Sequence, residues 1–450
     1  MTTRFEDVTR TGYQRKSEAS AGNIECVNDP VRLAIVGCGG MGRRHLAGLA
    51  ELVHTEHNNV QLIAVCDPNQ ANAEDLADEA HELLGDRPTV FATAERMIAE
   101  TDGLEAANCT TDSGSHHVVA TDLLERGLHV LCEKPLGLTI RGCDRIIDAA
   151  WRNRRLLSVA ENFRRDPINR LVRALLDDGA IGERQLMIET GIAGRDSILI
   201  TPWRHMKLSG SMPIDAGVHN ADILQYYFGP AASAFGHARL YEKRRVRRET
   251  AGPGGFYAKW AGNMPESIDA TGEDAILGLI TFANGALGQW IDHHAGHGQP
   301  THQRLVYGTR GSLVSPGDRN GRPVQLFRDD EPPVLDERIL DFAPGYRLNP
   351  VAAALFGGER VWRYGFDFPT TDRKLLALEY HELAECVRSG AAPEVSGEVA
   401  RRDVALVYAL FESQAAGRAV TIDEVESGAV DAYQREIDAH LGLIPVQTGG

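Results

Sequence analysis

The sequence predicts an α/β fold in two parts: a doubly wound parallel sheet, then an α+β domain with a large, mostly antiparallel open sheet. Three observations support this prediction. Short apolar segments alternate with helical patterns from 31 to 160, a glycine-rich turn follows the first apolar segment, and longer strand patterns dominate beyond 161. Repeated strand and helix units of this length are typical of a parallel sheet with helices on both faces.

The glycine-rich turn lies between a strand and a helix. Val31 to Val36 has the branched apolar side chains of a buried parallel strand, and Arg43 to Val53 has a helical apolar pattern. In such a turn the glycines allow a sharp bend, close approach of a pyrophosphate, and helix packing on the strand. The turn consists of Gly37, Cys38, Gly39, Gly40, Met41 and Gly42. We expect a dinucleotide to bind here, in a Rossmann domain.

The next strand pattern indicates which dinucleotide. Val60 to Cys66 is apolar and ends at Asp67, where a carboxylate can accept hydrogen bonds from the adenosine ribose hydroxyls. The same carboxylate would repel the 2′-phosphate of NADP, and the three residues after it include no arginine. NAD is therefore favoured over NADP.

Length and charge limit the possible partners. The 450 residues carry a formal net charge of −16, which argues against nucleic acid or an anionic membrane surface as the main partner. No apolar stretch approaches the roughly 20 residues that span a bilayer. The seven cysteines form no CxxC pair and fit reduced core thiols. We expect a cytoplasmic protein.

The pattern divides the chain into four parts. We expect a polar N-terminal extension over 1–30, an NAD-binding Rossmann domain over 31–160, a substrate-binding and oligomerisation domain over 161–425, and a tail over 426–450. In the third part, a strand is expected from His237 to Arg244, and Asn284-Gly285 predicts a hairpin. The stretches 247–273 and 315–371 are expected to be loop-rich.

Two groups of residues are candidates for chemistry. Glu133 and Lys134 follow a predicted strand, at the sheet edge where ligands bind in open α/β folds. Asp215 and His219 are four residues apart, so on one helix they would share a face, and the carboxylate would orient the imidazole. Each group also has a non-catalytic interpretation. Glu133 and Lys134 could form a solvated ion pair, and His219 could be a structural histidine at the start of a helix.

Taken together, these motifs resemble those of the Gfo/Idh/MocA oxidoreductases. The resemblance rests on the glycine turn, Asp67, the segment 111–116, Glu133-Lys134-Pro135, Asn162-Phe163-Arg164, Trp203-Arg204, and Asp215 with His219, in this order. It implies hydride transfer between NAD(P) and a sugar or cyclitol carbon, and an open sheet that often forms the subunit interface, hence a homo-oligomer, either dimer or tetramer.

By position, the resemblance also assigns site residues. The catalytic group is Lys134, Asp215 and His219. The cofactor site comprises Gly37, Gly39, Gly40, Met41, Gly42, Asp67, Thr111, His116, Glu133 and Lys134. The substrate site comprises Lys134, Asn162, Arg164, Trp203, Arg204, Asp215 and His219. Two departures from the family pattern, Thr111-Asp112 and Ser209-Gly210-Ser211, affect the cofactor and substrate loops.

The function predicted from both lines is NAD-dependent oxidation of a ring carbinol of a sugar, glycoside or cyclitol. His219, oriented by Asp215, takes the hydroxyl proton and Lys134 steadies the developing alkoxide, or the two exchange roles. The alternatives are a redox-neutral NAD-dependent glycoside hydrolase, lyase or epimerase that oxidises a sugar hydroxyl transiently, and a non-catalytic NAD-binding sensor.

Three other clusters have weaker interpretations. The histidines at 293, 294, 297 and 302 lack regular ligand spacing, so no metal is expected, and one or two of them are expected to line a sugar pocket. Arg164, Arg204, His205 and Lys207 are candidates for holding an anionic substituent, with surface charge as the alternative. The basic run 243–248 is interpreted as a solvated strand end or a subunit contact.

Overall fold

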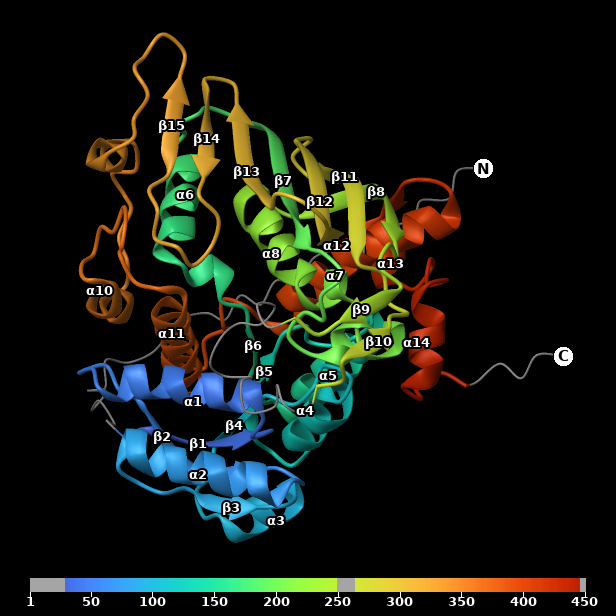
Figure 1. Ribbon diagram of the computed structural model, residues 1–450. Helices are drawn as coiled ribbons and strands as arrows, with labels where there is room; N and C mark the ends of the chain where they lie inside the picture. Colours follow the sequence, from blue (N-terminus) through green and yellow to red (C-terminus); the bar gives the residue numbers. More distant parts are fainter. Residues whose placement is uncertain (1–28, 249–263, 446–450) are drawn as a thin grey trace, which may run out of the picture.

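The computed structural model describes residues 29–248 and 264–445 (Figure 1). Three expectations therefore lie wholly or largely outside the described residues: the N-terminal extension, the reduced state of Cys26, and the middle of the 247–273 loop. The described chain forms two sheets, each with its own helices, and the C-terminal helices return to the first sheet (Figure 1).

The N-terminal sheet confirms the predicted doubly wound topology. Its six strands are all parallel and follow the order β3-β2-β1-β4-β5-β6. The strands are β1 Val31–Val36, β2 Val60–Cys66, β3 Thr89–Phe91, β4 Ala106–Cys109, β5 His129–Glu133 and β6 Leu157–Ala160. The helices between them are α1 Gly40–Val53, α2 Gln70–Leu84, α3 Ala94–Glu100, α4 His116–Glu125 and α5 Ile140–Asn153. The strands β1 and β2 have the predicted bounds, and α1 begins three residues before the predicted Arg43 and ends at the predicted Val53.

The glycine turn joins β1 to α1 and requires its small residues. Gly37 has a φ of +102°, and a Cβ there would lie 2.8 Å from the carbonyl carbon of Thr110. A Cβ on Gly42 would lie 2.3 Å from the Gly37 carbonyl oxygen, so only glycine lets the helix start this close to the strand.

The C-terminal sheet has eight strands and is mixed but mostly antiparallel. Its order is β15-β14-β13-β7-β12-β11-β8-β16, and β7 with β12 is the one parallel pair in this sheet. The strands are β7 Arg184–Gly194, β8 Ala231–Arg239, β11 Ala275–Phe282, β12 Leu287–Gly296, β13 Thr301–Gly308, β14 Gly311–Ser315, β15 Gln325–Arg328 and β16 Val420–Thr421. The Asn284-Gly285 hairpin between β11 and β12 is confirmed.

Helices cover one face of this sheet and reach back to the first domain. They are α6 Pro167–Asp177, α7 Met212–Asp215, α8 Gly217–Phe228, α10 Pro350–Phe356, α11 Phe368–Ser389, α12 Gly397–Ala416, α13 Ile422–Glu426 and α14 Gln434–His440. Figure 1 shows α11 beside α1, and a Cβ on Gly48 of α1 would lie 2.5 Å from the Cβ of Leu376. The two domains therefore share a packed interface beside the cofactor turn.

One prediction in this half is wrong. The strand expected from His237 to Arg244 is interrupted, because Asp274 accepts hydrogen bonds from the backbone N–H groups of Tyr241 and Glu242 and turns the chain there. A small ribbon of β9 Arg244–Val246 and β10 Ser267–Asp269 follows. In the basic run, Lys243, Arg244, Arg247 and Arg248 are exposed, in keeping with a solvated strand end. Arg245 is the exception, because it is fully buried and donates to Asp274 at 2.9 Å.

The stretches expected to be irregular hold more structure than predicted. Between 315 and 371 lie β15, the 3₁₀ helix Glu337–Phe342, α10 and the start of α11. The expected tail contains α14, which packs on the N-terminal domain: the Thr139 hydroxyl donates to Asp438 at 2.6 Å, and Gln434 accepts from the backbone N–H of Ile140 at 3.0 Å.

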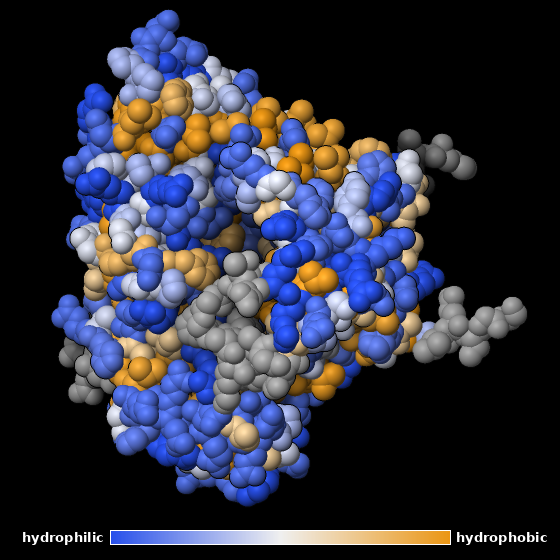
Figure 2. Space-filling view, viewed as in Figure 1, coloured by the Kyte–Doolittle hydropathy of each residue, from blue (hydrophilic) through white to orange (hydrophobic). Residues whose placement is uncertain are grey.

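The opposite face of the C-terminal sheet carries exposed apolar side chains. They are Phe235, Leu277, Leu279, Leu287, Tyr307 and Phe327. The strand register places Leu279 beside Phe235. Figure 2 shows hydrophobic side chains gathered over the strands of this sheet. Within the part of the chain that the structure describes, no helix combines the length and the apolar character needed to cross a membrane.

Candidate active site

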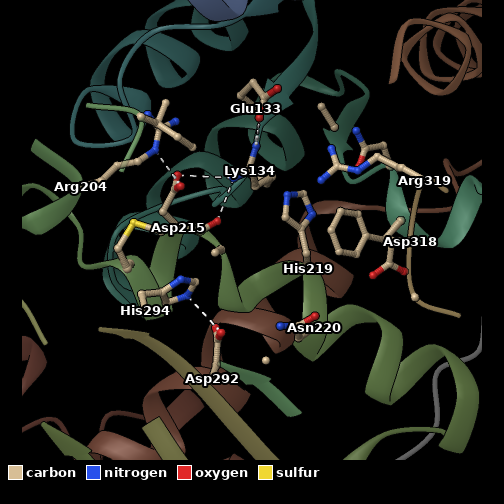
Figure 3. A pocket seen from close by; sticks show the side chains of 18 of the residues that line it. Glu133, Lys134, Arg204, Asp215, His219, Asn220, Asp292, His294, Asp318 and Arg319 are labelled. Carbon is tan, nitrogen blue, oxygen red and sulfur yellow. Dashed lines mark hydrogen bonds and ion pairs between the residues drawn. The ribbon is translucent and has the colours of Figure 1, made fainter. Parts of the chain in front are cut away.

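A cavity of about 660 Å³ lies between the carboxyl edge of the N-terminal sheet and the C-terminal sheet (Figure 3). Both domains line it, as expected for a site that joins a cofactor to a substrate. The predicted residues that line it are Met41, Thr111, His116, Glu133, Lys134, Asn162, Trp203, Arg204, Asp215 and His219.

The glycine turn fits a dinucleotide. Among the described residues, no atom lies within 4 Å of a Cβ placed on Gly39, so the backbone at the start of α1 faces open space, and no side chain of this part of the chain caps the helix. Its first amides are thus available to a pyrophosphate. Asp67, at the end of β2, accepts hydrogen bonds from the backbone N–H groups of Cys38 at 2.7 Å and Asn69 at 2.8 Å, which fixes the carboxylate beside the turn.

Lys134 is held at the end of β5 by a buried polar network. Glu133 accepts a hydrogen bond from the Lys134 backbone N–H at 2.9 Å and contacts His45 Nε2 of α1 at 2.9 Å. Asn108 joins this network, because its Nδ2 lies 2.7 Å from His45 Nδ1 and 2.6 Å from the Tyr380 hydroxyl. The strand end, α1 and α11 together therefore fix the backbone that carries the Lys134 side chain.

The Lys134 ammonium points at Asp215 (Figure 3). Its Nζ donates to the Asp215 carbonyl oxygen at 2.8 Å and lies 3.4 Å from Oδ1, while Arg204 Nε donates to Oδ2 at 2.7 Å. Burial alone would raise the pKa of Asp215, but the Arg204 and Lys134 charges outweigh it and hold that pKa well below its usual value. Asp215 is thus a permanent negative charge between two cations.

The expectation that Asp215 orients His219 is wrong. Helix α7 ends at Asp215 and α8 begins at Gly217, so the two residues do not share the face of one helix. The partner of His219 is instead Glu161, whose two carboxylate oxygens each lie 2.7 Å from Nδ1. The Phe163 ring stacks on the imidazole with centroids 4.1 Å apart and planes 4° apart, which fixes the orientation of the ring.

Glu161 and His219 have pKa values shifted toward the neutral form of each group. Burial raises the pKa of Glu161 to about 7, against the opposing effects of the Phe163 N–H and the Lys134 charge. Burial likewise lowers the pKa of His219 well below its usual value, and the Lys134 and Arg319 charges lower it further. His219 is therefore uncharged near neutral pH.

Arg164 does not reach the cavity, contrary to the prediction. It is buried against Asp222, and its Nε donates to both carboxylate oxygens at 3.0 Å. The expected anion cluster is not assembled either: His205 Nε2 accepts from the Leu199 N–H at 2.9 Å, and Lys207 pairs with Glu436 at 2.6 Å. Of those four residues only Arg204 lines the cavity, and it is held by Asp215.

Two of the four clustered histidines line the cavity, as predicted. His294 and His302 do so, and His294 Nε2 lies 3.0 Å from Asp292 Oδ1 (Figure 3). Among the described residues, the one group with metal-ligand spacing includes none of these four histidines and consists of Cys109, His116 and Cys132. Both ring nitrogens of His116 already contact carbonyl oxygens, of Pro135 at 2.9 Å and of Thr111 at 3.2 Å, so we assign no metal to this group.

Several residues of the site have no counterpart in the sequence prediction. Asp292 lies on β12, and Asp318 and Arg319 lie on the loop after β14, far along the chain from the motifs. Their convergence depends on strand order and register. Glu161 follows β6 at the same sheet edge as Glu133, so the rule that points to Glu133 also points to Glu161.

Comparison with known proteins agrees with this geometry. Residues 31–161 match the model of the oxidoreductase family with an NAD-binding Rossmann fold, and residues 190–422 match the model of the C-terminal alpha/beta domain of the same family. The chain belongs to the Gfo/Idh/MocA oxidoreductase family. Its N-terminal domain binds NAD.

Curated relatives of this Gfo/Idh/MocA protein are similar over most of their length. A levoglucosan dehydrogenase of Pseudarthrobacter phenanthrenivorans is 25% identical over 80% of this chain and 89% of its own. A myo-inositol 2-dehydrogenase of Thermotoga maritima is 24% identical over 88% of this chain and 99% of its own.

Solved structures share the fold. An NAD-binding oxidoreductase from Klebsiella pneumoniae superposes with a TM-score of 0.70 at 20% identity, covering 87% of this chain and 99% of the other. A levoglucosan dehydrogenase in complex with NADH and L-sorbose gives a TM-score of 0.67 at 21% identity, over 87% and 98% of the two chains.

Proposed function

We propose that this enzyme uses NAD to oxidise a ring carbinol of a neutral sugar, glycoside or cyclitol. The observation that carries the proposal is the convergence of Lys134 and His219 in one cavity at the carboxyl edge of the NAD-binding sheet. The curated relatives compared above are named as dehydrogenases of a sugar derivative and of a cyclitol, which supports the same substrate class.

The cofactor, when bound, supplies the acceptor for the carbinol hydride. The residues proposed to hold it are the glycine turn, Met41, Asp67, Thr111, His116 and Glu133. The chain's own residues handle the hydroxyl: His219 Nε2 accepts its proton, because Nδ1 is engaged by Glu161. The Lys134 ammonium donates to the oxygen as negative charge develops there. Asp215, itself held by Arg204, orients that ammonium.

The charges around the cavity favour a neutral substrate. Of the five lysines and arginines that line the cavity, four have a carboxylate partner: Asp215 pairs with Lys134 and Arg204, and Asp372 pairs with Arg44 and Arg319. The fifth, Arg322, is exposed to solvent. Asn162 and Asp292 each present a buried oxygen that has no hydrogen-bond partner among the described residues, and both line the cavity. Substrate hydroxyls can satisfy such acceptors. With Trp203 at the wall, this gives the polar and aromatic lining that suits a carbohydrate.

We also propose that residues 161–425 form the substrate and oligomerisation domain, and that the enzyme is a homo-oligomer through the open face of the C-terminal sheet. Support comes from the exposed apolar side chains of that face, Leu277, Leu279 and Phe235 among them. A Leu279→Arg variant should lower the molar mass measured by light scattering.

We place the protein in the cytoplasm, in keeping with the six described cysteines, all of which are free thiols.

The test is a panel of inositols, free sugars, glycosides and sugar acids, each incubated with NAD or NADP. Reduced cofactor and substrate loss are followed in the same tube. We expect NADH to form in proportion to loss of a neutral polyol, with NAD preferred over NADP. Substrate loss without net NADH would instead favour a redox-neutral hydrolase, lyase or epimerase. NAD binding with no turnover of any compound would favour a sensor.

A further inference from the structure

We propose that Glu161 is the proton store of this active site: it takes the Nδ1 proton of His219 when Nε2 receives the proton of the substrate hydroxyl. The proposal rests on the proposed carbinol oxidation. It makes Glu161 a positioning residue, because Glu161 lies behind His219 and does not line the cavity.

The geometry permits a proton to cross between the two side chains. Both Glu161 oxygens lie 2.7 Å from Nδ1, and the Phe163 backbone N–H donates to Oε1 at 3.0 Å, which holds the carboxylate in place. The Phe163 ring keeps the imidazole in one plane. With Nδ1 facing Glu161, the other ring nitrogen is left for the cavity that His219 lines.

The surroundings favour storage of a proton over a permanent ion pair. The side chain of Glu161 is 3% exposed and that of His219 is 11% exposed, so a charged pair would have little solvent to stabilise it. The shifted pKa values described above agree with this. The charged groups that act on Glu161 are Lys134, Arg164, Arg319, Asp222, Glu379 and Asp403. These groups carry charges of both signs, so no single cation holds Glu161 in its ionised form in the way that Arg204 holds Asp215.

The proposed reaction is balanced in protons and electrons. The substrate O–H bond breaks and its proton bonds to His219 Nε2, while the Nδ1–H bond breaks and that proton bonds to a Glu161 oxygen. The oxidised nicotinamide, when bound, would accept the hydride of the carbinol carbon, which would become a carbonyl carbon. Glu161 ends as a neutral acid and His219 as the neutral Nε2–H tautomer. Once the product leaves, the Nε2 proton of His219 passes to water and the proton on Glu161 returns to Nδ1.

The test begins with the cofactor-free protein. Nitrogen-15 NMR of the protein with labelled histidine distinguishes the Nδ1–H tautomer, the Nε2–H tautomer and the imidazolium, and a His219→Gln variant identifies the signal. We expect His219 to be the Nδ1–H tautomer at pH 8.5 and to become the Nε2–H tautomer, still neutral, as the pH falls through about 7. A Glu161→Gln variant should lose that change.

The kinetic arm uses single turnovers with NAD and the substrate found in the panel. Glu161→Gln should slow hydride transfer about 10²-fold at pH 8 with little change in substrate affinity. The matched control is Glu412→Gln, another buried glutamate with a raised pKa, on α12 away from the cavity, and it should keep the wild-type rate.

Two results would overturn the proposal. One is a His219 that becomes imidazolium in the wild-type protein near pH 7. The other is a Glu161→Gln enzyme with the wild-type rate and pH profile. The NMR titration needs neither variant turnover nor substrate, so its outcome stands even if the panel shows that the enzyme oxidises no carbinol.

Discussion

The two carboxylates on either side of the catalytic group differ in their surroundings. Asp215 lies between Arg204 and Lys134, and these charges hold its pKa far below the usual value although it is buried. Glu161 is equally buried but faces a neutral imidazole, and burial raises its pKa to about 7. One acid is therefore a fixed charge and the other can change protonation at neutral pH.

This difference assigns different work to the two carboxylates. A fixed negative charge orients the Lys134 side chain beside the substrate oxygen. An acid that titrates near neutral pH accepts and returns a proton. The surroundings of each carboxylate, more than its residue type, determine its role. Substitution of Asp215 and of Glu161 should distinguish the two roles experimentally.

The largest effect is expected from Lys134→Met. This change removes the donor to the developing alkoxide, so kcat should fall by about 10³-fold or more. Steady-state kinetics with the panel substrate measures it, and Lys207→Met, which removes a lysine outside the cavity, is the control. A Lys134→Met enzyme with more than a tenth of the wild-type kcat would refute the assigned role.

A smaller effect is expected from Asp215→Asn. Loss of the fixed charge frees the Lys134 ammonium to adopt other positions, so kcat should fall by roughly 10²-fold. Because Asp215 stays ionised throughout the neutral range, the pH at half-maximal rate should not move. A shifted pH profile in this variant would mean that Asp215 titrates during turnover.

The stability of Glu161→Gln should depend on pH. The folded pKa of Glu161 is raised from 4.5 to about 7, so the native state binds more protons than the unfolded state between these values. The contribution of Glu161 to stability is thus present below pH 4.5 and lost as the pH rises through 7. The free energy of unfolding of the variant, relative to that of wild type, should increase by on the order of 2 kcal/mol between pH 5 and pH 8, as measured by urea unfolding. A pH-independent difference would contradict the raised pKa.

The smallest effect is expected from Phe163→Leu. This change removes the ring that stacks on His219 but keeps an apolar side chain. The imidazole should sample more orientations, which lowers kcat by about tenfold and leaves the pH profile in place. A kcat equal to that of wild type would show that the Glu161 contact alone orients His219.

Much of the fold was predictable from the sequence, because it depends on local patterns. The strand-turn-helix pattern around Gly37 to Gly42 and the end of β5 placed Lys134 at the ligand edge. The predicted partner of His219 was wrong because one continuous helix through Asp215 was assumed, whereas the helix is interrupted at Ala216. Arg164 was misplaced because its pairing with Asp222 depends on tertiary packing. The cavity walls from β12 and the loop after β14 likewise depend on long-range register.

The central claim, that one carboxylate is fixed and the other titrates, is tested most directly by three pH profiles. The rate of NAD-dependent oxidation is measured from pH 5.5 to 9 for the wild type, Asp215→Asn and Glu161→Gln. We expect the wild-type rate to rise with pH through about 7, Asp215→Asn to keep that rise at a lower rate, and Glu161→Gln to lose it. A rise that persists in Glu161→Gln and disappears in Asp215→Asn would contradict the account.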